Sequence, residues 1–496
     1  MRPMSAVTAP QTLPIVPPAA DRSSSIRAVR ILIWTYLVLL VVEGALRKWA
    51  LPRFSDPLLI IRDPVVLAIY IFAIRARLFP INGYLVTVGA IGVLSFIVTI
   101  ITLYPYLPLQ VILLVDGYGF RSDFLHLPLI FVMAEALDLE DVQKIGRWTM
   151  LLAIPMAALM VLQFKASPDS FINKTVGLGE GMQLSTAGGK IRPPATFSFI
   201  AGPIFYLSAT TAFLIYGALN RNVYRSWLLL ATAGAVVTGV IVSGSRGCVL
   251  AVGVVALAIL VIFVVRPSAM NKIAGALLAL AVVGFLVGLF ASHLPFLKEG
   301  MDVLSERFTT SAEAAETTVV GGLIERVIDG FTEPFKYLLK IPVTGYGLGL
   351  GTSGGARFLI GQGGLLFSEN EWIRIIAESG SILGIAFIIW RIALTVKLFR
   401  VSLRALKAGE VLSVLLFATA LLGTLNGQFG QPTTLGFTMA LAGLCLAAAN
   451  FSENVSDAPE SQEELTPKRL PRRSPYAERI HGGAIGPDQT NGSADR

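Results

Sequence analysis

Long apolar runs without charge are the strongest constraint on how this chain folds. Runs of about 17–25 such residues have the length that an α-helix needs to cross the hydrocarbon core of a bilayer. The sequence of 496 residues is 54% hydrophobic and 15% charged, whereas soluble proteins carry roughly 25% charged residues. Because the runs are helix-length and do not alternate, they favour a helical bundle over an outer-membrane barrel. We therefore expect an all-α, polytopic membrane protein.

The runs predict about twelve spans, with an uncertainty of one or two. They are expected at 31–42, 57–74, 83–103, 124–137, 148–164, 197–219, 227–242, 273–291, 372–396, 411–425 and 435–449. The eighth span follows the hairpin at 243–247 and ends at 265. A shorter apolar piece at 105–115 is expected to be re-entrant or interfacial. The flanking segments 1–26 and 450–496 are rich in Pro, Ser or charge and predict disordered tails around a transmembrane domain at 27–449.

The distribution of Lys and Arg predicts the orientation. Basic clusters at 75–77, 221–225, 266–272 and 397–407 fall on one side, which the positive-inside rule assigns to the cytoplasm together with both termini. The loops at 165–196 and 292–371 then face outward. The larger one contains apolar residues at helical spacing, which predict an amphipathic helix: Leu323, Val327, Phe331, Phe335 and Leu338.

Composition and motifs argue against several classes of function. The net charge of +8 lies largely in short loops and in the C-terminal tail, where orientation and anionic lipid account for it, so nucleic acid is not an expected partner. Cys248 and Cys445 lie in apolar runs and are expected to be small buried hydrophobes. The sequence contains no HExxH, P-loop or Gly-x-Ser-x-Gly pattern, so we expect no metal and no cofactor.

Four arginines on the predicted outward side suggest a shared anion. Arg246 lies in the hairpin SGSRG between two apolar runs, Arg121 and Arg192 stand at the mouths of predicted spans, and Arg326 lies on the predicted amphipathic helix. Arginine suits phosphate because its planar guanidinium binds two oxygens and stays charged. Each arginine alone is also compatible with an interfacial residue that contacts lipid phosphate or water.

The stretch 341–391 combines a glycine run with a charged cluster at the start of an apolar run. The glycine run, 345–351, lacks the dinucleotide spacing, so it is either a turn or a segment that approaches a ligand closely. Glu369 and Asn370 are either a helix N-terminal cap or, for the carboxylate, a general base. Glu378 would be costly within a span, and we expect it to pair with Arg374 at i,i+4.

Four motifs, in order, resemble a family of bacterial membrane enzymes. RPPATFSFIAGP from Arg192, SGSRG followed by an apolar run, IERVIDGF with IPVTGYGLG, and SENEWIRIIAESGSILG lie between residues 192 and 390. They are similar to the R-x-x-G-T-F…P-N, S-R-G, R…W…P-L-x-G-x-G-x-G and H-N-x-y-L…E-x-G-x-x-G patterns of O-antigen ligases and Wzy-type polysaccharide polymerases. The chain departs from the family where it has Glu369–Asn370 in place of the family's His–Asn.

The resemblance implies a C-type membrane glycosyltransferase fold with a periplasmic site in the bacterial inner membrane. Such enzymes move a glycan from undecaprenyl diphosphate to a glycan or lipid acceptor, without nucleotide sugar and typically without metal, and work beside polysaccharide-assembly proteins. Arg246 and Arg326 would hold the diphosphate, with Arg192 a weaker match. Glu369 and Asn370 would be the catalytic pair in place of the family's His–Asn, with Glu369 as the base. Polymerase and ligase remain unseparated.

Two other readings stay open. A transporter of a lipid or small solute suits about twelve spans, and the short piece at 105–115 favours it. A non-catalytic polysaccharide-assembly protein would tolerate glutamate in place of histidine at position 369.

Overall fold

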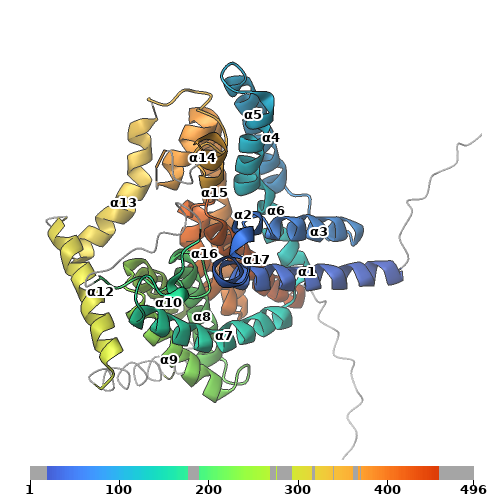
Figure 1. Ribbon diagram of the computed structural model, residues 1–496. Helices are drawn as coiled ribbons and strands as arrows, with labels where there is room; N and C mark the ends of the chain where they lie inside the picture. The colour runs from blue at the N-terminus through green and yellow to red at the C-terminus, as the bar shows by residue number, and fades with distance from the viewer. Residues whose placement is uncertain are drawn as a thin grey trace, which may run out of the picture. The chain divides into compact units, whose positions relative to one another are not determined.

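The computed structural model describes residues 19–176, 189–267, 275, 293–314, 319–338, 340–360, 367–368 and 370–456. Its contacts divide the chain into two units, Met1–Glu453 and Asn454–Arg496, and the first contains the fold described here. The regular elements of the described residues are all helical, in agreement with the all-α prediction (Figure 1).

The helices follow the chain with short connections. They are α1 (Ala19–Ala45), η1 (Leu46–Ala50), η2 (Pro52–Phe54), α2 (Ser55–Leu58), α3 (Arg62–Arg75), α4 (Gly83–Leu103), α5 (Leu109–Phe120), η3 (Arg121–Leu125), α6 (Leu127–Ala136), α7 (Leu139–Lys165), η4 (Phe171–Asn173), α8 (Ala201–Leu219), α9 (Ser226–Val242), α10 (Arg246–Val265), α12 (Pro295–Ala314), α13 (Val319–Tyr337), α14 (Ser353–Ile360), α15 (Glu371–Ala408), α16 (Leu412–Asn426) and α17 (Pro432–Ser456).

Eight helices of the described residues are long and apolar enough to cross a membrane, so the chain is a multi-pass membrane protein. They are Arg22–Ala50, Pro52–Arg75, Gly83–Leu103, Leu139–Lys165, Ala201–Leu219, Arg246–Val265, Glu371–Ala408 and Pro432–Asn450. Each corresponds to a predicted span. Two further predicted spans coincide with the shorter apolar helices α9 and α16. The run at 124–137 contains the end of η3 and the 10-residue helix α6. The run at 273–291, apart from residue 275, lies outside the described residues.

The core lies around α8 and α17. In these two helices 83% and 94% of the most apolar 18-residue stretch is buried, against 28% in α4 and α10. The peripheral helices leave large apolar side chains exposed, such as Ile101 and Val264. Exposed apolar side chains of this kind match a surface covered by lipid. Both cysteines are buried and unbridged, as expected.

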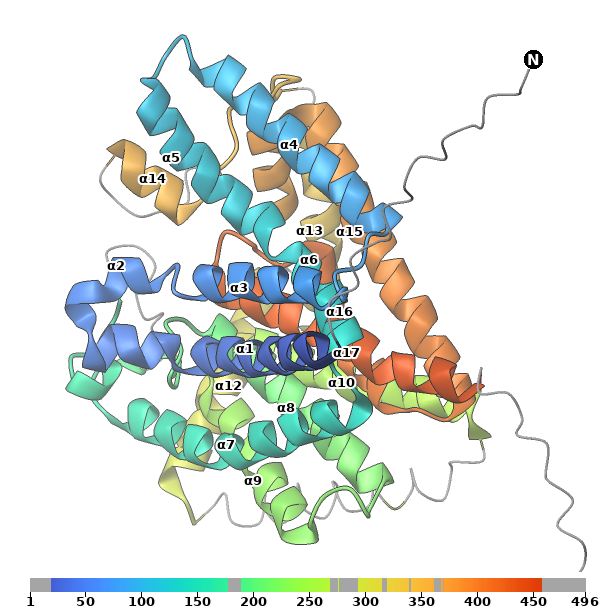
Figure 2. The ribbon, with the colours of Figure 1, turned by 90° about the vertical axis from the view of Figure 1, so that its right-hand side faces the viewer.

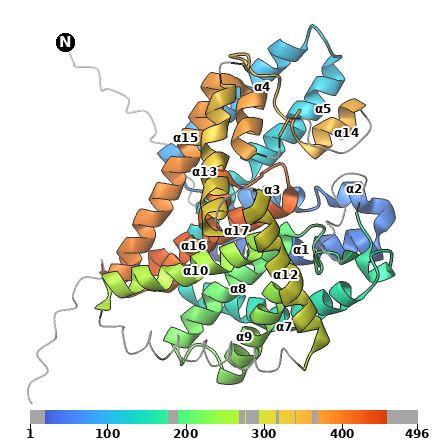
Figure 3. The same ribbon diagram turned by 90° about the vertical axis from the view of Figure 1, so that its left-hand side faces the viewer.

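The longest helix, α15, is broken inside the fold. Gly380 has φ 78° and ψ 175°, so α15 consists of two helical parts that meet there. Figure 2 shows the antiparallel pair of α4 and α5 beside the upper part of α15. Figure 3 shows α12 and α13 along one side of the bundle, where α13 packs against α15. Four of the five periodic residues of the large loop lie in α13, as predicted, and Leu338 directly follows its last residue.

Helices extend into both segments that the sequence predicts as tails. Helix α1 begins at Ala19, so residues 19–26 are helical, and Ser25 within them is buried. Helix α17 continues to Ser456, past the predicted end of the transmembrane domain at 449. The physical reason is that backbone hydrogen bonding continues into polar sequence once an apolar segment has nucleated the helix.

Candidate functional site

A network of buried charges joins the start of α15 to η3. Arg374 donates to the carboxylates of Asp123 (2.6 Å), Glu371 (2.9 Å) and Glu378 (2.8 Å). All four side chains are at most 3% exposed. The predicted pairing of Glu378 with Arg374 is confirmed. Buried ion pairs offset their desolvation only when further hydrogen bonds satisfy them, and here the guanidinium fork serves three carboxylates at once.

Arg391 completes the network from the second part of α15. It donates to Glu371 (3.0 Å) and to the carbonyl oxygens of Gly423, Thr424 and Gly427. Its guanidinium lies 3.8 Å from the centre of the Phe429 ring. These contacts fasten both parts of α15 to the end of α16, so the network stabilises the broken helix.

The glycine run packs against this break. Just before Gly380, the carbonyls of Ala377 and Glu378 accept from the backbone N–H groups of Tyr346 (2.7 Å) and Gly347 (3.1 Å). Gly345, Gly347 and Gly349 all have positive φ, which favours glycine. The glycine run is therefore a close backbone approach, but to the protein itself.

Glu378 is also held by the glycine run. Its carboxylate accepts from the N–H groups of Gly349 (3.1 Å) and Gly351 (2.8 Å). A Cβ on Gly349 would overlap the carbonyl oxygen of Val115 on α5. The segment is thus wedged between α5 and α15, and the buried charge of Glu378 is compensated by backbone donors and by Arg374.

Asn370 is the N-terminal cap of α15. Its Oδ1 accepts from the N–H of Trp372 (3.0 Å), and its Nδ2 donates to the carbonyl of Gly330 on α13 (2.9 Å). The Trp372 ring packs edge-on against Phe331 at 5.0 Å between ring centres. The capping interpretation of Asn370 is confirmed. Glu369, the predicted base, lies outside the described residues, but its neighbour is fixed to α13.

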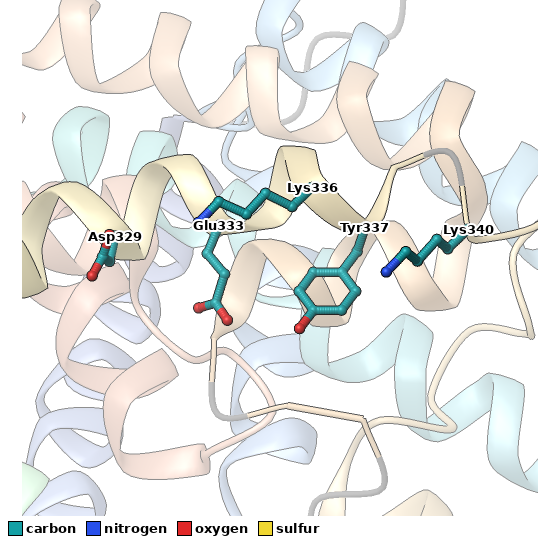
Figure 4. A pocket seen from close by; sticks show the side chains of 5 residues that line it. All are labelled: Asp329, Glu333, Lys336, Tyr337 and Lys340. Atoms are coloured by element: carbon teal, nitrogen blue, oxygen red, sulfur yellow. The ribbon is translucent and has the colours of Figure 1, made fainter.

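The polar face of α13 and the residues after it line a pocket of about 390 Å³. The lining residues are Asp329, Glu333, Lys336, Tyr337 and Lys340 (Figure 4). Figure 4 shows the Glu333 carboxylate and the Tyr337 ring projecting to the same side of the helix. The Lys340 ammonium lies 5.5 Å from the centre of that ring. The pocket combines an aromatic ring with carboxylate acceptors and ammonium donors. This combination suits a polyhydroxylated ligand such as a sugar.

The predicted anion-binding arginines occupy different places. Arg246 is the first residue of α10, half-buried after the 243–245 turn, as the hairpin prediction required. Arg192 is half-buried in the segment before α8. This segment is tied to α12 by the ion pair of Lys190 with Glu299 (3.1 Å). The α12 helix also packs against α9 and α10, so it contacts both the segment that carries Arg192 and the helix that begins at Arg246. Arg326 lies in α13, and its side chain is outside the described set.

Arg121 belongs to a different, internal cluster. It is buried, pairs with Asp63 and donates to the carbonyl of Leu59 (2.9 Å). Asp63 also contacts Nε2 of His126 (2.9 Å). Burial lowers the pKa of His126 to about 4, although Asp63 opposes the shift. The contacts of Arg121 give it a structural role at the junction of α3 and η3 instead of the predicted place at an outward mouth.

A further cluster at the end of α1 is one that sequence reasoning missed. The buried Lys48 donates to the carbonyls of Ala195 (2.6 Å) and Phe197 (2.8 Å), inside the first of the four motifs. Glu43 pairs with Arg62 (3.0 Å) and Arg47 (3.6 Å). The only signal in the sequence is the charged segment EGALRKWALPR between two apolar runs. Its charges support the loop that carries Arg192.

Among the described residues, no group of three or more His, Cys, Asp and Glu side chains is arranged to hold a metal ion. No protein-family model matches the chain, and its comparison with curated proteins finds no match. The interpretation of the site therefore rests on the residues and their geometry.

Proposed function

We propose that the protein transfers a glycan from undecaprenyl diphosphate to a sugar hydroxyl at the outer face of a bacterial inner membrane. The reaction polymerises or ligates O-antigen or exopolysaccharide repeats. One observation carries this proposal: the hydrogen bond from Asn370 to Gly330 (2.9 Å) joins the fourth motif to the third beside the polar pocket of α13. Asn370, at the position of the family's His–Asn, is thus bonded to the helix whose polar face lines the pocket suited to a sugar.

The chemistry divides between two groups of residues. Diphosphate is an anionic leaving group, so it needs stabilisation of charge more than a proton donor, and arginines provide this. Arg246, Arg192 and Arg326 have that role, and Arg246 has the added advantage of standing at a helix N-terminus, where the helix dipole favours anions. Glu369 accepts the proton of the acceptor hydroxyl. Arg121 is assigned to the internal cluster and takes no part.

Complementation of a deletion strain tests the proposal. Arg246→Ala and Glu369→Gln should abolish long-chain polysaccharide, while the exposed Arg225→Ala serves as a matched control and restores it. Membrane levels of each variant must equal those of the wild type. Full chain length with both variants would overturn the catalytic assignment.

The same strains distinguish a polymerase from a ligase. Accumulation of single lipid-linked repeats in the Arg246→Ala strain indicates a polymerase. Accumulation of complete chains that are not joined to a lipid acceptor indicates a ligase. Either result supports glycosyl transfer from a lipid-linked donor.

The break in α15 at Gly380 favours a second candidate, a transporter. Transporters use discontinuous helices with buried charged groups at the break, and Glu378 lies two residues before Gly380. A defect in uptake or export of a labelled solute, together with normal glycans in the deletion strain, would support transport over glycosyl transfer.

A further inference from the structure

Asp116 on α5 is a buried acid that the network around Arg374 does not include. Its side chain is 0% exposed, and neither carboxylate oxygen has a hydrogen-bond partner in the described part of the chain. An ionised carboxylate in such a place costs far more than a neutral one unless a positive group accompanies it. Buried polar atoms without partners in a folded protein call for a specific explanation, such as a bound ion or water.

The neighbouring helix α4 carries a second buried oxygen without a partner among the described residues. Ser95 on α4 is 1% exposed, and its Oγ has no partner among the described residues. The α4–α5 pair is antiparallel, and a Cβ on Gly92 would meet Phe120 and Phe124. Counting along both helices from that contact places Ser95 within a turn of Asp116.

Both residues face the glycine run. Thr99, one turn from Ser95 on α4, accepts through Oγ1 from the N–H of Leu348 (2.8 Å). A Cβ on Gly119, which shares a face of α5 with Asp116, would overlap the backbone of Gly349. Thr99 Oγ1 also donates to the carbonyl of Ser95 (2.9 Å). Asp116, Ser95 and Thr99 therefore lie on the faces of α4 and α5 that pack against residues 348–349, and the space between these faces is the candidate site.

Glu378 contributes negative charge beside this candidate site. On the far side of the glycine run is Glu378, whose carboxylate is already matched by Arg374 and two backbone donors. Burial, reinforced by the Glu378 charge, raises the pKa of Asp116 to about 8. Of the elements packed on α5, α4 has no charged residue, α14 has Arg357, and η3 has Arg121 and Asp123, which are paired with Asp63 and Arg374.

We propose that Asp116, Ser95 and Thr99 form a buried site for a small monovalent cation, Na⁺, in the α4–α5 hairpin behind the glycine run. Hard cations prefer carboxylate, hydroxyl and water oxygens, which is the donor set present. A single uncompensated carboxylate matches one positive charge. The cation stabilises the segment that holds Glu378 and the break in α15, and a proton on Asp116 competes with it. This inference is independent of the proposed glycosyl transfer.

The test is the thermal unfolding of the purified full-length protein in detergent. NaCl is titrated against choline chloride at constant ionic strength, at pH 6.5 and pH 9, with KCl as a second comparison. We expect a saturable rise in Tm of several degrees with Na⁺ at pH 9. The rise should be smaller at pH 6.5, because Asp116 then keeps its proton.

Variants assign the effect to the site. Asp116→Asn should abolish the Na⁺ effect, and Ser95→Ala should raise the half-saturating Na⁺ concentration about tenfold. Asp116→Glu, which keeps the carboxylate, covers the case in which Asp116→Asn does not fold, and should retain a weakened effect. Thr438→Ala removes another buried hydroxyl, on α17, that has no partner among the described residues, and should leave the Na⁺ effect unchanged.

The absence of a Na⁺-specific rise at pH 9 in the wild type would overturn the proposal and leave Asp116 as a protonated acid. A full Na⁺ effect in Asp116→Asn would also overturn it.

Discussion

The replacement Arg374→Met tests whether the buried charge network stabilises the fold. The change removes five hydrogen bonds to carboxylates and keeps most of the side-chain volume. Two arginines, Arg374 and Arg391, face three carboxylates, Asp123, Glu371 and Glu378, so the net charge of the network changes from −1 to −2. Removing one partner of a buried pair costs about 3–5 kcal/mol. We expect a loss near the middle of that range.

The assay is reversible unfolding in mixed micelles of detergent and SDS, followed by tryptophan fluorescence. The exposed Arg225→Met is the control and should change stability by less than about 0.5 kcal/mol. The double variant Arg374→Met with Asp123→Asn should recover at least about 1 kcal/mol, because it removes a carboxylate left without its partner.

The pH dependence provides a second check. Burial raises the pKa of Asp123, and Arg374 is the main group that opposes this. Without Arg374 the pKa rises further, the folded state binds more protons than the unfolded state, and the variant's deficit should shrink as the pH falls. A loss below about 1 kcal/mol, or a further loss on adding Asp123→Asn, would refute this account of the network.

Three further predictions concern other parts of the fold. Gly349→Ala should destabilise the protein by about 2–4 kcal/mol in the same assay, since its φ is +87° and the new Cβ would overlap the carbonyl of Val115. Gly89→Ala is the control, because a Cβ at Gly89 would meet no atom of another segment within 4 Å, and it should be neutral or stabilising. Equal losses of stability in Gly349→Ala and Gly89→Ala would contradict the packing argument. Lys48→Met should cost about 2–4 kcal/mol, because it leaves two buried carbonyls without a donor; a neutral result would show that those carbonyls find other donors. Burial lowers the pKa of His126 to about 4, below its ordinary 6.5, so the folded state binds fewer protons than the unfolded state between these values. Stability should therefore fall by up to roughly 3 kcal/mol as the pH drops through this window. His126→Gln should flatten that profile, and an unchanged slope would contradict the assignment.

Local patterns predicted most of the helices. The apolar run at 83–103 coincides with α4, Gly83–Leu103, because its ends are marked by the capping Asn82 and by a Tyr-Pro turn. The pairing of Arg374 with Glu378 follows from i,i+4 spacing on one helix. Helix α13 follows from apolar residues at helical spacing. Each of these inferences depends on residues close together in the sequence.

The sequence was less informative where a run is apolar but short. The predicted span at 124–137 forms a π-helical turn and a 10-residue helix whose residues are almost all buried. Hydrophobicity alone does not distinguish a segment that faces lipid from one enclosed by other helices. Arg121 illustrates the same limit, because its partner Asp63 is 58 residues away in the chain.

The sequence alone determined that the chain is a helical, multi-pass membrane protein, because span length and the absence of charge are local properties of each run. It also marked 341–391 as the stretch with unusual glycine and charge. Only the tertiary structure decided what that stretch does. The glycine run meets α5, more than 200 residues earlier in the chain, and holds Glu378 at the break in α15. Long-range contacts of this kind arise from packing between helices, which no local pattern encodes.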